Sequence, residues 1–544
     1  MSYLDTEKNF FGRKAELDLL RRRVIALKEG YRQNVSLLGA PYVGKSSLLK
    51  NFLQNLDDPD LVVIYLDLEH KDFQYFYSKF TLSLLYNYSK SAKLSLHEDF
   101  NLLVESVRGH IPHTIQVIQR IRDDFSKGKA GAAYLGLLAL PEVFTNETGK
   151  FCVLILDEFQ VIEEFGLPDA FLDLGKKIMT QKKCFYVLSS SYPSAAQKII
   201  SERLSLLFGN FENINVEPFD LQTSQEFIEH SLKGVKMGAT LRNFLTDFTG
   251  GHPLYLNLIC KEIIHLSAVH KQQEAYMPIV SQAVENTLFD RWGVISRHFE
   301  LIVMDLCQSK GNKMLSLILM ALANGYHKID AIAKDTGLRK SQVSQKMQRL
   351  FEQGFVTKNG SFHYYKDRLF KYWIKFIYQR RLKDPELTPD KRRKEYKEEF
   401  NACVESFQAD SRKDFTSRII ELLHCFDNES FDINGRRYRL PVFDEVVPFK
   451  VRGEGNQHCD VLKATAGGSV WFIIVKKDNI GENDVMISLK EARKIAQKPE
   501  RCLLVSMSQL DDHTRLKALQ EKFWIWNQGE LNTLLNLYDK PFIV

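Results

Sequence analysis

Paired cysteines are missing from this sequence, although it contains eight cysteines in 544 residues. No two of them are at the C-x-x-C spacing that is typical of zinc sites. Scattered cysteines argue against a disulfide framework and against a zinc site, and they favour a reducing cytosol. The eight residues are Cys152, Cys184, Cys260, Cys307, Cys403, Cys425, Cys459 and Cys502.

Long apolar runs are also missing. The most apolar stretch, AGAAYLGLLALPEVF at 130–144, contains a proline and is shorter than the roughly 18 to 20 residues that a membrane-spanning helix needs. We therefore expect a buried helix and loop there. The first residues, MSYLDTEKNFFGRKAE, lack the apolar core of a signal peptide. The sequence thus predicts a cytoplasmic protein without a membrane partner.

A strong charge excess is the third missing feature. Charged residues make up 26% of the chain, and the net charge is +6. A balance this mildly basic does not by itself indicate a nucleic-acid partner. The hydrophobic share of 44% is ordinary for a globular protein. At about 150 residues per domain, a chain of this length predicts three or four domains.

A phosphate-binding loop is the clearest feature that the sequence does contain. In LLGAPYVGKSSLLKNF, 37–52, a glycine is followed by four residues and then by Gly-Lys-Ser. The preceding segment, NVSLLGA, has the pattern of a buried strand, and the following one has that of a helix with an apolar face, which is the context that such a loop requires. Backbone N–H groups and the helix N-terminus would then face phosphate charge. The residues expected to bind ATP or ADP here are Gly39, Ala40, Pro41, Tyr42, Val43, Gly44, Lys45, Ser46 and Ser47.

A second motif predicts hydrolysis of the nucleotide. Lys45 would reach the β- and γ-phosphates, and Ser46 would hold Mg²⁺. Hydrolysis also needs an acidic residue at the end of another buried strand. FCVLILDEFQ, 151–160, supplies Asp157 as the expected Mg²⁺ ligand and Glu158 as the group that orients and polarises the attacking water. We therefore expect Glu158 and Lys45 to be catalytic; a surface acidic pair that ends a strand is the alternative.

Two further segments have the pattern of strands in the same sheet. They are the segment around 61–69, LVVIYLDLE, and CFYVLSSSYP at 184–193. The second ends in three consecutive serines, of which Ser190 is expected to sense the γ-phosphate; ordinary strand-end turn chemistry is the alternative. Strands that alternate with helices predict an α/β fold with a parallel sheet covered on both faces.

The order of these motifs resembles a known family of ATPases. Phe11-Gly12-Arg13 with Glu16-Leu17 resembles the F-x-G-R-x-x-E-L opening of AAA-related and STAND-type P-loop ATPases. GGHPLYLNLI, 250–259, resembles their G-x-P lid motif. The chain looks most like the archaeal-type ATPase family, which also occurs in bacteria. The resemblance covers nearly the whole chain in order and is most specific up to the lid motif.

The resemblance implies a helical lid after the nucleotide-binding core. In the family this segment lies close to the bound nucleotide. The resemblance therefore implies that Gly251 and Pro253 lie near the nucleotide here, and it implies this less securely for His252. Pro253 would begin a lid helix, since proline suits a first helical turn; an ordinary loop-to-helix junction is the alternative. Arg203 has a family-like position for an arginine finger, but a solvated helix arginine is an equal alternative.

A winged helix-turn-helix is predicted for residues 313–366. Three helical segments, KMLSLILMALANG, HKIDAIAKDTGL and RKSQVSQKMQRLFEQG, precede a hairpin wing around Asn359-Gly360. The basic, glutamine-rich outer face of the third helix could lie in a major groove of DNA. A protein-interaction module with a solvated charged face is an equal alternative. The inner stripe of the third helix is expected to consist of Val343, Met347, Leu350 and Phe351.

The resemblance also implies a nuclease-like domain at the C-terminus. The elements expected after residue 411 resemble the restriction-endonuclease-like fold, whose site needs a carboxylate on one strand and Glu/Asp-x-Lys on the next. Asp460 is in the first position, but Ile474 and Val475 stand where the second carboxylate belongs. We therefore expect a degenerate domain that does not cleave DNA, although it could still bind DNA or a protein.

Together these patterns predict five segments and a function. The segments are a P-loop ATPase core at 1–235, a helical lid at 236–305, a winged helix at 306–382, a charged linker leading into a solvated helix at 383–410, and the nuclease-like domain at 411–544. The predicted function is a Mg²⁺-dependent ATP-binding and hydrolysing switch. It would couple nucleotide state to the C-terminal half, with DNA, protein or another copy of the chain as partner. Two alternatives stay open: a slow-turnover ATP- or ADP-bound scaffold in regulation or defence, acting through protein contacts, and an active DNA nuclease.

Overall fold

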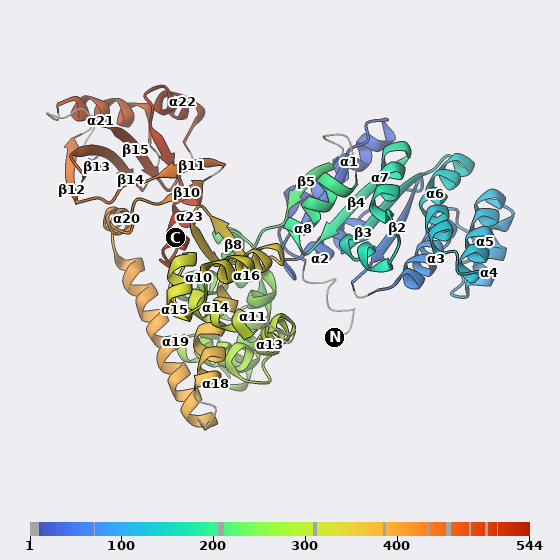
Figure 1. Ribbon diagram of the computed structural model, residues 1–544, viewed down its shortest axis with the longest axis horizontal. Helices are drawn as coiled ribbons and strands as arrows, with labels where there is room; N and C mark the ends of the chain where they lie inside the picture. Colours follow the sequence, from blue (N-terminus) through green and yellow to red (C-terminus); the bar gives the residue numbers. More distant parts are fainter. Residues whose placement is uncertain are drawn as a thin grey trace. The chain divides into compact units, whose positions relative to one another are not determined.

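The described residues of the chain fall into two units. The first contains the residues up to Phe219 together with 252–254 and 352–354, and the second contains the others. Figure 1 shows the computed structural model coloured along the sequence. The residues that the structure describes are 10–69, 71–204, 211–307, 313–383, 388–433, 435–452, 458–477, 480–494, 499–508 and 510–543.

A five-stranded sheet organises the first unit (Figure 1). Its strands are β1 (Asn34–Leu38), β2 (Leu61–Asp67), β3 (Phe151–Asp157), β4 (Cys184–Ser190) and β5 (Phe211–Asn215). Their order across the sheet is β2-β3-β4-β1-β5. Every neighbouring pair is parallel, so the strands must be joined by crossover segments, and these are helical.

Successive residues of a strand point to opposite faces of the sheet, and both faces are buried. On one face, Val35, Ile155 and Val187 pack into a core with helices α1 (Lys14–Lys28) and α2 (Lys45–Gln54). The apolar residues of α1 recur every three to four positions, so one side of this helix meets the sheet.

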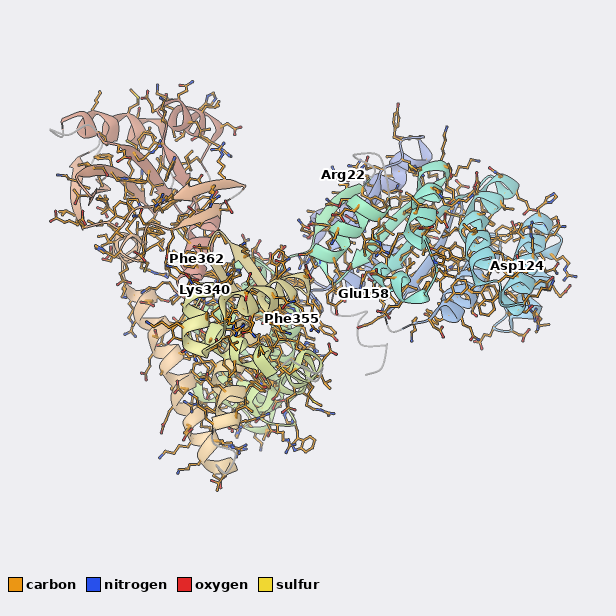
Figure 2. The ribbon with its side chains drawn as sticks, viewed as in Figure 1. Arg22, Asp124, Glu158, Lys340, Phe355 and Phe362 are labelled. Atoms are coloured by element: carbon orange, nitrogen blue, oxygen red, sulfur yellow. The ribbon has the colours of Figure 1, made fainter. Side chains whose placement is uncertain are left out.

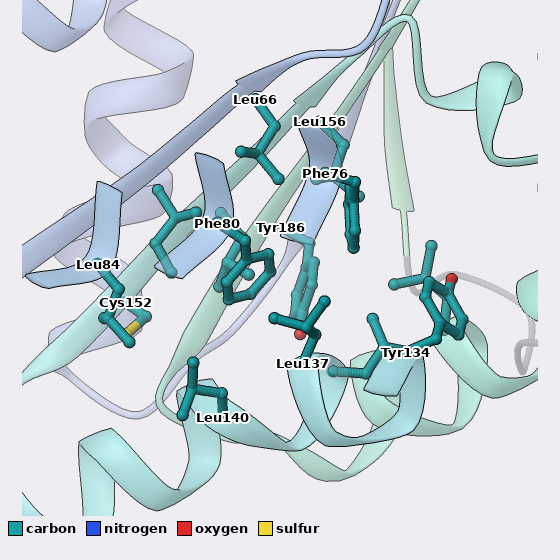
Figure 3. Packing of buried hydrophobic residues seen from close by; sticks show 14 of the residues in the cluster. Leu66, Phe76, Phe80, Leu84, Tyr134, Leu137, Leu140, Cys152, Leu156 and Tyr186 are labelled. Atoms are coloured by element: carbon teal, nitrogen blue, oxygen red, sulfur yellow. The ribbon is translucent and has the colours of Figure 1, made fainter. Parts of the chain in front are cut away.

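The opposite face of the sheet has the larger core, shown in Figure 3. Helices α3 (Phe73–Ser91), α6 (Ala130–Thr148) and α7 (Ala170–Thr180) contribute to it. Helices α4 (Phe100–Arg108) and α5 (Pro112–Ser126) extend it. Helices therefore cover both faces of a parallel sheet, which confirms the predicted α/β class. The residues labelled in Figure 3 are Leu66, Phe76, Phe80, Leu84, Tyr134, Leu137, Leu140, Cys152, Leu156 and Tyr186.

The apolar stretch 130–144 forms one continuous helix, so the predicted helix and loop is wrong. Pro141 lies inside α6 and cannot donate a hydrogen bond to the carbonyl four residues earlier, at a cost of about 3 kcal/mol. Leu137, Leu140 and Phe144 are fully buried. Each such side chain contributes roughly 1.5 to 3 kcal/mol, so together they outweigh the proline. No helix in the described ranges, α6 included, is long and apolar enough to cross a membrane.

The second unit begins with a set of helices. Between α10 and α11, Gly250 and Gly251 both have positive φ angles of 61° and 70°, which glycine adopts without strain. Pro253 is the first residue of α11, where its missing N–H costs no hydrogen bond. The helices are α9 (Leu221–Ser231), α10 (Ala239–Thr249), α11 (Pro253–Val269), α12 (Met277–Val284) and α13 (Val294–Cys307).

Three helices and a hairpin follow, in the order predicted for 313–366. Val343, Met347 and Leu350 are buried as expected, whereas Phe351 is only partly buried. The short helices α17 (Arg368–Trp373) and α18 (Gln379–Lys383) come next. The elements of the predicted segment are α14 (Lys313–Ala323), α15 (Ile329–Thr336), α16 (Lys340–Glu352), β8 (Val356–Asn359) and β9 (Phe362–Tyr365).

The charged segment expected as a linker with a solvated helix contains a long helix that is partly buried. Residues 384–387 lie outside the described part, and α19 spans Pro389–Arg412. Phe244 of α10 packs edge-to-face against Phe400 and Phe407 of α19, with ring centroids 5.5 and 5.7 Å apart. In the sequence of α19, apolar residues recur at helical spacing among many charged residues. The buried residues of that stripe are Tyr396, Phe400, Val404 and Phe407.

A five-stranded mixed sheet forms the C-terminal part. Its strand order is β12-β13-β14-β15-β16, antiparallel from β12 to β14 and parallel from β14 to β16. The sequence did not predict β16 or a separate small hairpin, because these strands are short. The strands are β12 (Glu445–Arg452), β13 (His458–Ala466), β14 (Ser469–Lys476), β15 (Arg501–Ser506) and β16 (Trp524–Trp526), and the hairpin is β10 (Ser430–Ile433) with β11 (Arg436–Arg439). The helices are α20 (Phe415–Leu423), α21 (Glu482–Lys494), α22 (Asp512–Gln520) and α23 (Gln528–Leu537).

The β8–β9 hairpin is built into this C-terminal part. Phe362, labelled in Figure 2, is 4% exposed and belongs to the same core as Leu422 and Trp526. Asn359 donates its amide to the carbonyl of Asp432 at 2.8 Å and accepts the Asp432 N–H at 2.5 Å. A Cβ on Gly360 would lie 1.8 Å from the carbonyl oxygen of Ser430. The tip of the hairpin is therefore covered by β10.

Candidate active site

The carboxyl ends of three adjacent strands meet at one edge of the parallel sheet. β4 lies between β1 and β3, and Ser189 of β4 is in register with both Leu37 and Asp157. Parallel strands end at the same edge, and open α/β sheets bind ligands in the crevice outside it. The strand order therefore brings the loop after β1, the acidic pair after β3 and the serines of β4 together.

The loop between β1 and α2 has a tightly curled backbone. Gly44 has a φ of 106° and Tyr42 a φ of 59°, and glycine adopts such angles at least cost. A Cβ on Gly39 would lie 2.4 Å from the carbonyl oxygen of Val216, so a larger residue does not fit there. The first N–H groups of α2 have no partner within the helix and face the loop with the positive end of the helix dipole. Pro41, Tyr42 and Ser47 are exposed on this loop, while Ser46 is partly exposed.

Lys45 is buried at the centre of the site, with 3% of its surface exposed. Its ammonium group donates to the carbonyl oxygens of Gly39 at 3.1 Å and Ala40 at 3.0 Å. It also donates to the hydroxyl of Ser191 at 2.8 Å and lies 4.0 Å from Glu158 Oε1. A buried ammonium group is stable only among acceptors or anions. The ammonium group predicted to meet the terminal phosphates is thus held by the loop and by Ser191, the residue that follows β4.

Asp157 has the burial and the unused oxygen expected of a Mg²⁺ ligand. Its side chain is 1% exposed, and Tyr65 donates its hydroxyl to Oδ2 at 3.0 Å. Oδ1 is buried and has no hydrogen-bond partner among the described residues. A buried carboxylate oxygen without a donor is costly, and a hard cation would satisfy it. The residues present therefore fit Mg²⁺, with Asp157 and Ser46 as the side chains to hold it.

Glu158, labelled in Figure 2, is fixed in a strained conformation. Its φ of 55° is rare for a residue other than glycine, and such strain is concentrated at functional sites. Oε2 accepts hydrogen bonds from the Gln160 side chain at 2.8 Å and from the Ser191 N–H at 2.9 Å. Oε1 accepts one from the Ser191 hydroxyl. A carboxylate held beside Lys45 in this way can orient and polarise a water molecule.

Ser191, rather than the predicted Ser190, faces this group of residues. The Ser191 hydroxyl bridges Lys45 and Glu158. Ser190 is fully buried, and its hydroxyl accepts the N–H of Tyr192 at 3.1 Å. Consecutive residues at the end of a strand point to opposite sides, so only one of two neighbouring serines can face the site. Three serines in a row carry no signal that selects Ser191.

The segment around Pro253 reaches the loop through His252. Its Nε2 lies 3.2 Å from the carbonyl oxygen of Pro41, and since that oxygen only accepts, Nε2 carries the proton. Gly251 and Pro253 flank His252 and place it. Burial lowers the pKa of His252 to about 4, assisted by the charges of Lys45 and Arg13 and opposed by the bond to Pro41. From the motif alone, His252 was the least secure of the three expected residues. In the structure, His252 is the residue that makes the hydrogen bond to the loop.

We expect His252 to stay neutral well below the pH at which an exposed histidine gains a proton. Because its folded pKa lies below the unfolded value of about 6.5, the native state loses up to about 3 kcal/mol as the pH falls from about 6.5 to about 4. Nuclear magnetic resonance of ¹³C-labelled histidines should show one ring that titrates near pH 4. That signal should be missing in His252→Gln; titration of the same ring near 6.5 would show that it is not buried as described.

The two arginines that the motifs singled out have different surroundings, and only Arg13 contacts the loop. Arg13, whose position the sequence did not reveal, donates to the carbonyl oxygens of Val43 at 3.4 Å and of Glu217. Its guanidinium also lies 5.0 Å from the ring centre of Phe219, so it ties the loop to the segment after β5. Arg203, the candidate finger, pairs with Glu163 and lies 4.7 Å from the ring centre of Phe171.

Comparisons with known proteins give one family match and several similar solved structures. Residues 10–259 match the family model of an ATPase domain predominantly from Archaea. Among solved structures, the chain is similar to the Walker-type ATPase of Pyrococcus abyssi, with 16% identity, a TM-score of 0.49, and coverage of 68% of this chain and 97% of that one. For the ORC2 protein of Aeropyrum pernix the identity is 11% and the TM-score 0.43, with coverage of 70% of this chain and 98% of that one. For the ORC1 protein of Aeropyrum pernix in complex with DNA the identity is 13% and the TM-score 0.38, with coverage of 68% of this chain and 93% of that one.

The family match covers the residues of the candidate site. No curated protein matches the sequence, but the family model spans the loop, both acidic residues and His252. The resemblance first seen in the motifs is therefore confirmed for the ATPase domain at residues 10–259. Residues 10–259 match the model of the ATPase domain found predominantly in Archaea.

Proposed function

We propose that this protein is a Mg²⁺-dependent ATPase that uses its nucleotide state to control the C-terminal half. The observation that carries the proposal is the joint placement of Lys45, Glu158 and Ser191 beside Asp157, which has a free buried oxygen. The curled loop would bind the phosphates through its N–H groups, and Lys45 would neutralise charge that develops on the γ-phosphate. Glu158 would orient the water that attacks it. Mg²⁺, held by Ser46 and Asp157, would supply further neutralisation.

A slow-turnover switch is the second candidate, and one observation favours it. Both carboxylate oxygens of Glu158 are occupied by donors from Ser191 and Gln160, so Glu158 must release at least one of them to bind water. Phosphate release from ATP, measured with Mg²⁺ and with EDTA, tests the ATPase proposal. Comparing the single-turnover rate with the steady-state rate distinguishes the candidates, because a switch would hydrolyse once and then retain ADP. No Mg²⁺-dependent phosphate release in either format would contradict both.

Ser191→Ala should slow hydrolysis, and Ser190→Ala is its matched control. Removing the Ser191 hydroxyl breaks its hydrogen bonds to both Lys45 and Glu158. A hydrogen bond to a charged group contributes about 1.5 to 3 kcal/mol, which corresponds to a roughly ten- to hundredfold lower rate. The Ser190 hydroxyl accepts only from the chain beside it, so Ser190→Ala should retain the wild-type rate. An equal decrease of the hydrolysis rate in the two variants would show that the Ser191 hydroxyl does not assist hydrolysis.

The C-terminal half would carry the output of this ATPase. We propose that α14, α15, α16 and the β8–β9 hairpin act as a winged helix whose outer α16 face contacts DNA or a protein. The GGHP segment would transmit the nucleotide state, because His252 contacts the loop and α10 precedes it directly in the chain. A nuclease is not proposed. Asp460 accepts a hydrogen bond from Thr416 at 2.7 Å and is in register with Val475, and across the described ranges no group of three metal-ligating side chains occurs.

A further inference from the structure

An arginine-rich strand lies on the surface of the C-terminal part. β11 has the sequence Arg436-Arg437-Tyr438-Arg439, and its three arginines are exposed. Its partner strand β10 offers one carboxylate, that of Asp432, which is in register with Arg437. Neither Arg436 nor Arg437 forms an ion pair with a residue that the structure describes. Arg439 donates to the carbonyl oxygen of Asn428 at 3.2 Å.

A fourth arginine lies against two aromatic rings on the Tyr438 side of β11. Tyr438 points to the opposite side of β11 from Arg437 and Arg439 and packs edge-to-face on Trp524, with ring centroids 4.9 Å apart. The guanidinium of Arg501 lies 5.3 Å from the centre of the Trp524 ring. Arg501 is exposed, and both rings are half-buried. The three exposed arginines of β11, Arg436, Arg437 and Arg439, are named the arginine surface below.

The strand that carries the arginine surface pairs with the strand that covers the tip of the β8–β9 hairpin. The tip of the β8–β9 hairpin is covered by β10, through Asn359, Gly360 and Phe362. A covered tip cannot enter a groove of a nucleic acid. The strand on the other side of β10 is β11, so this small hairpin both holds the wing and carries the exposed arginines.

The chemistry of these side chains points to a phosphodiester backbone as the ligand. β11 contains arginine and no lysine, and the planar guanidinium binds two phosphate oxygens at once. Half-buried Tyr438 and Trp524 hold the neighbouring backbone and the Arg501 side chain in place. We propose that the arginine surface binds the phosphate backbone of nucleic acid, independently of ATP hydrolysis at the first unit.

The test is binding of a fluorescein-labelled DNA duplex, and of one of its single strands, to the full chain as salt is varied from roughly 50 to 200 mM. The combined variant Arg436→Gln, Arg437→Gln and Arg439→Gln should weaken duplex binding at low salt by about tenfold or more. It should also reduce the slope of log affinity against log salt by about 2.7, at about 0.9 per phosphate contact.

The matched control removes three exposed arginines from helices α4 and α5, by Arg108→Gln, Arg120→Gln and Arg122→Gln. It lowers the net charge equally and should leave binding unchanged. The combined variant Arg436→Lys, Arg437→Lys and Arg439→Lys retains the charge and should bind with intermediate affinity. It keeps the proposal testable if the glutamine variant unfolds. Equal losses in variant and control, no DNA binding by the wild type, or equal displacement of DNA by poly-glutamate would overturn the proposal.

Discussion

Glu158→Gln is expected to lower the rate of ATP hydrolysis by about a hundred- to ten-thousandfold while ATP binding persists. Glutamine has nearly the shape of glutamate, but it cannot polarise a water molecule as a carboxylate does, and general-base contributions are of this size. Lys45 and the loop, which would bind the phosphates, are unchanged by this substitution. Phosphate release with Mg²⁺ measures the rate, and equilibrium binding of a fluorescent ATP analogue measures the affinity.

Glu163→Gln is the control for this experiment. Glu163 lies in the short helix that follows Glu158, Phe159–Phe165, but its carboxylate is exposed and pairs with Arg203. Glu163→Gln should hydrolyse ATP at the wild-type rate. If Glu158→Gln hydrolyses ATP as fast as the wild type, Glu158 does not orient the water, and the catalytic assignment is wrong.

Arg368→Met is expected to destabilise the second unit by about 3 to 5 kcal/mol, because it leaves a buried carboxylate without its ionic partner. Arg368 donates to the two carboxylate oxygens of Asp247 in α10 at 3.0 and 3.4 Å. Its guanidinium lies 4.3 Å from the ring centre of Phe542, whose N–H donates to Asp247 Oδ1 at 3.1 Å. Burial is the largest influence and lowers the pKa of Arg368, but the charges of Asp247, Tyr372 and Asp539 and the hydrogen bond to Asp247 together raise the pKa above its ordinary value. The cluster therefore joins α10, α17 and the C-terminal end.

Tryptophan fluorescence during urea unfolding measures this loss selectively. All five tryptophans belong to the second unit: Trp292, Trp373, Trp471, Trp524 and Trp526. Arg381→Met is the control, since Arg381 pairs with the partly exposed Glu300, and such pairs contribute about 1 kcal/mol or less. If Arg368→Met shifts the fluorescence transition no more than Arg381→Met does, the cluster around Asp247 does not stabilise the second unit.

The parts of the site that the sequence predicted depend on local patterns. Buried strands appear as short apolar runs, and the glycines, Lys45 and Ser46 stand at the spacing that a loop between strand and helix requires. Asp157 and Glu158 follow an apolar run directly, so their position at a strand end could be predicted. These features need no knowledge of which strands are neighbours.

The parts that the sequence did not predict depend on contacts between distant segments. Ser191 could be separated from Ser190 only once β4 was known to lie between β1 and β3. The burial of α19 depends on Phe244 of α10, and its charges hide the stripe that meets this residue. The covered tip of the β8–β9 hairpin depends on β10, a strand too short for its pattern to stand out.

Single-turnover hydrolysis of γ-³²P-labelled ATP, with the protein in excess, shows whether this site hydrolyses ATP. We expect the wild type to release labelled phosphate with Mg²⁺ and not with EDTA. Lys45→Ala, which lacks the buried ammonium group of the site, should release none. Intact ATP after prolonged incubation with the wild type and Mg²⁺, or undiminished hydrolysis by Lys45→Ala, would contradict the claim that this site hydrolyses ATP.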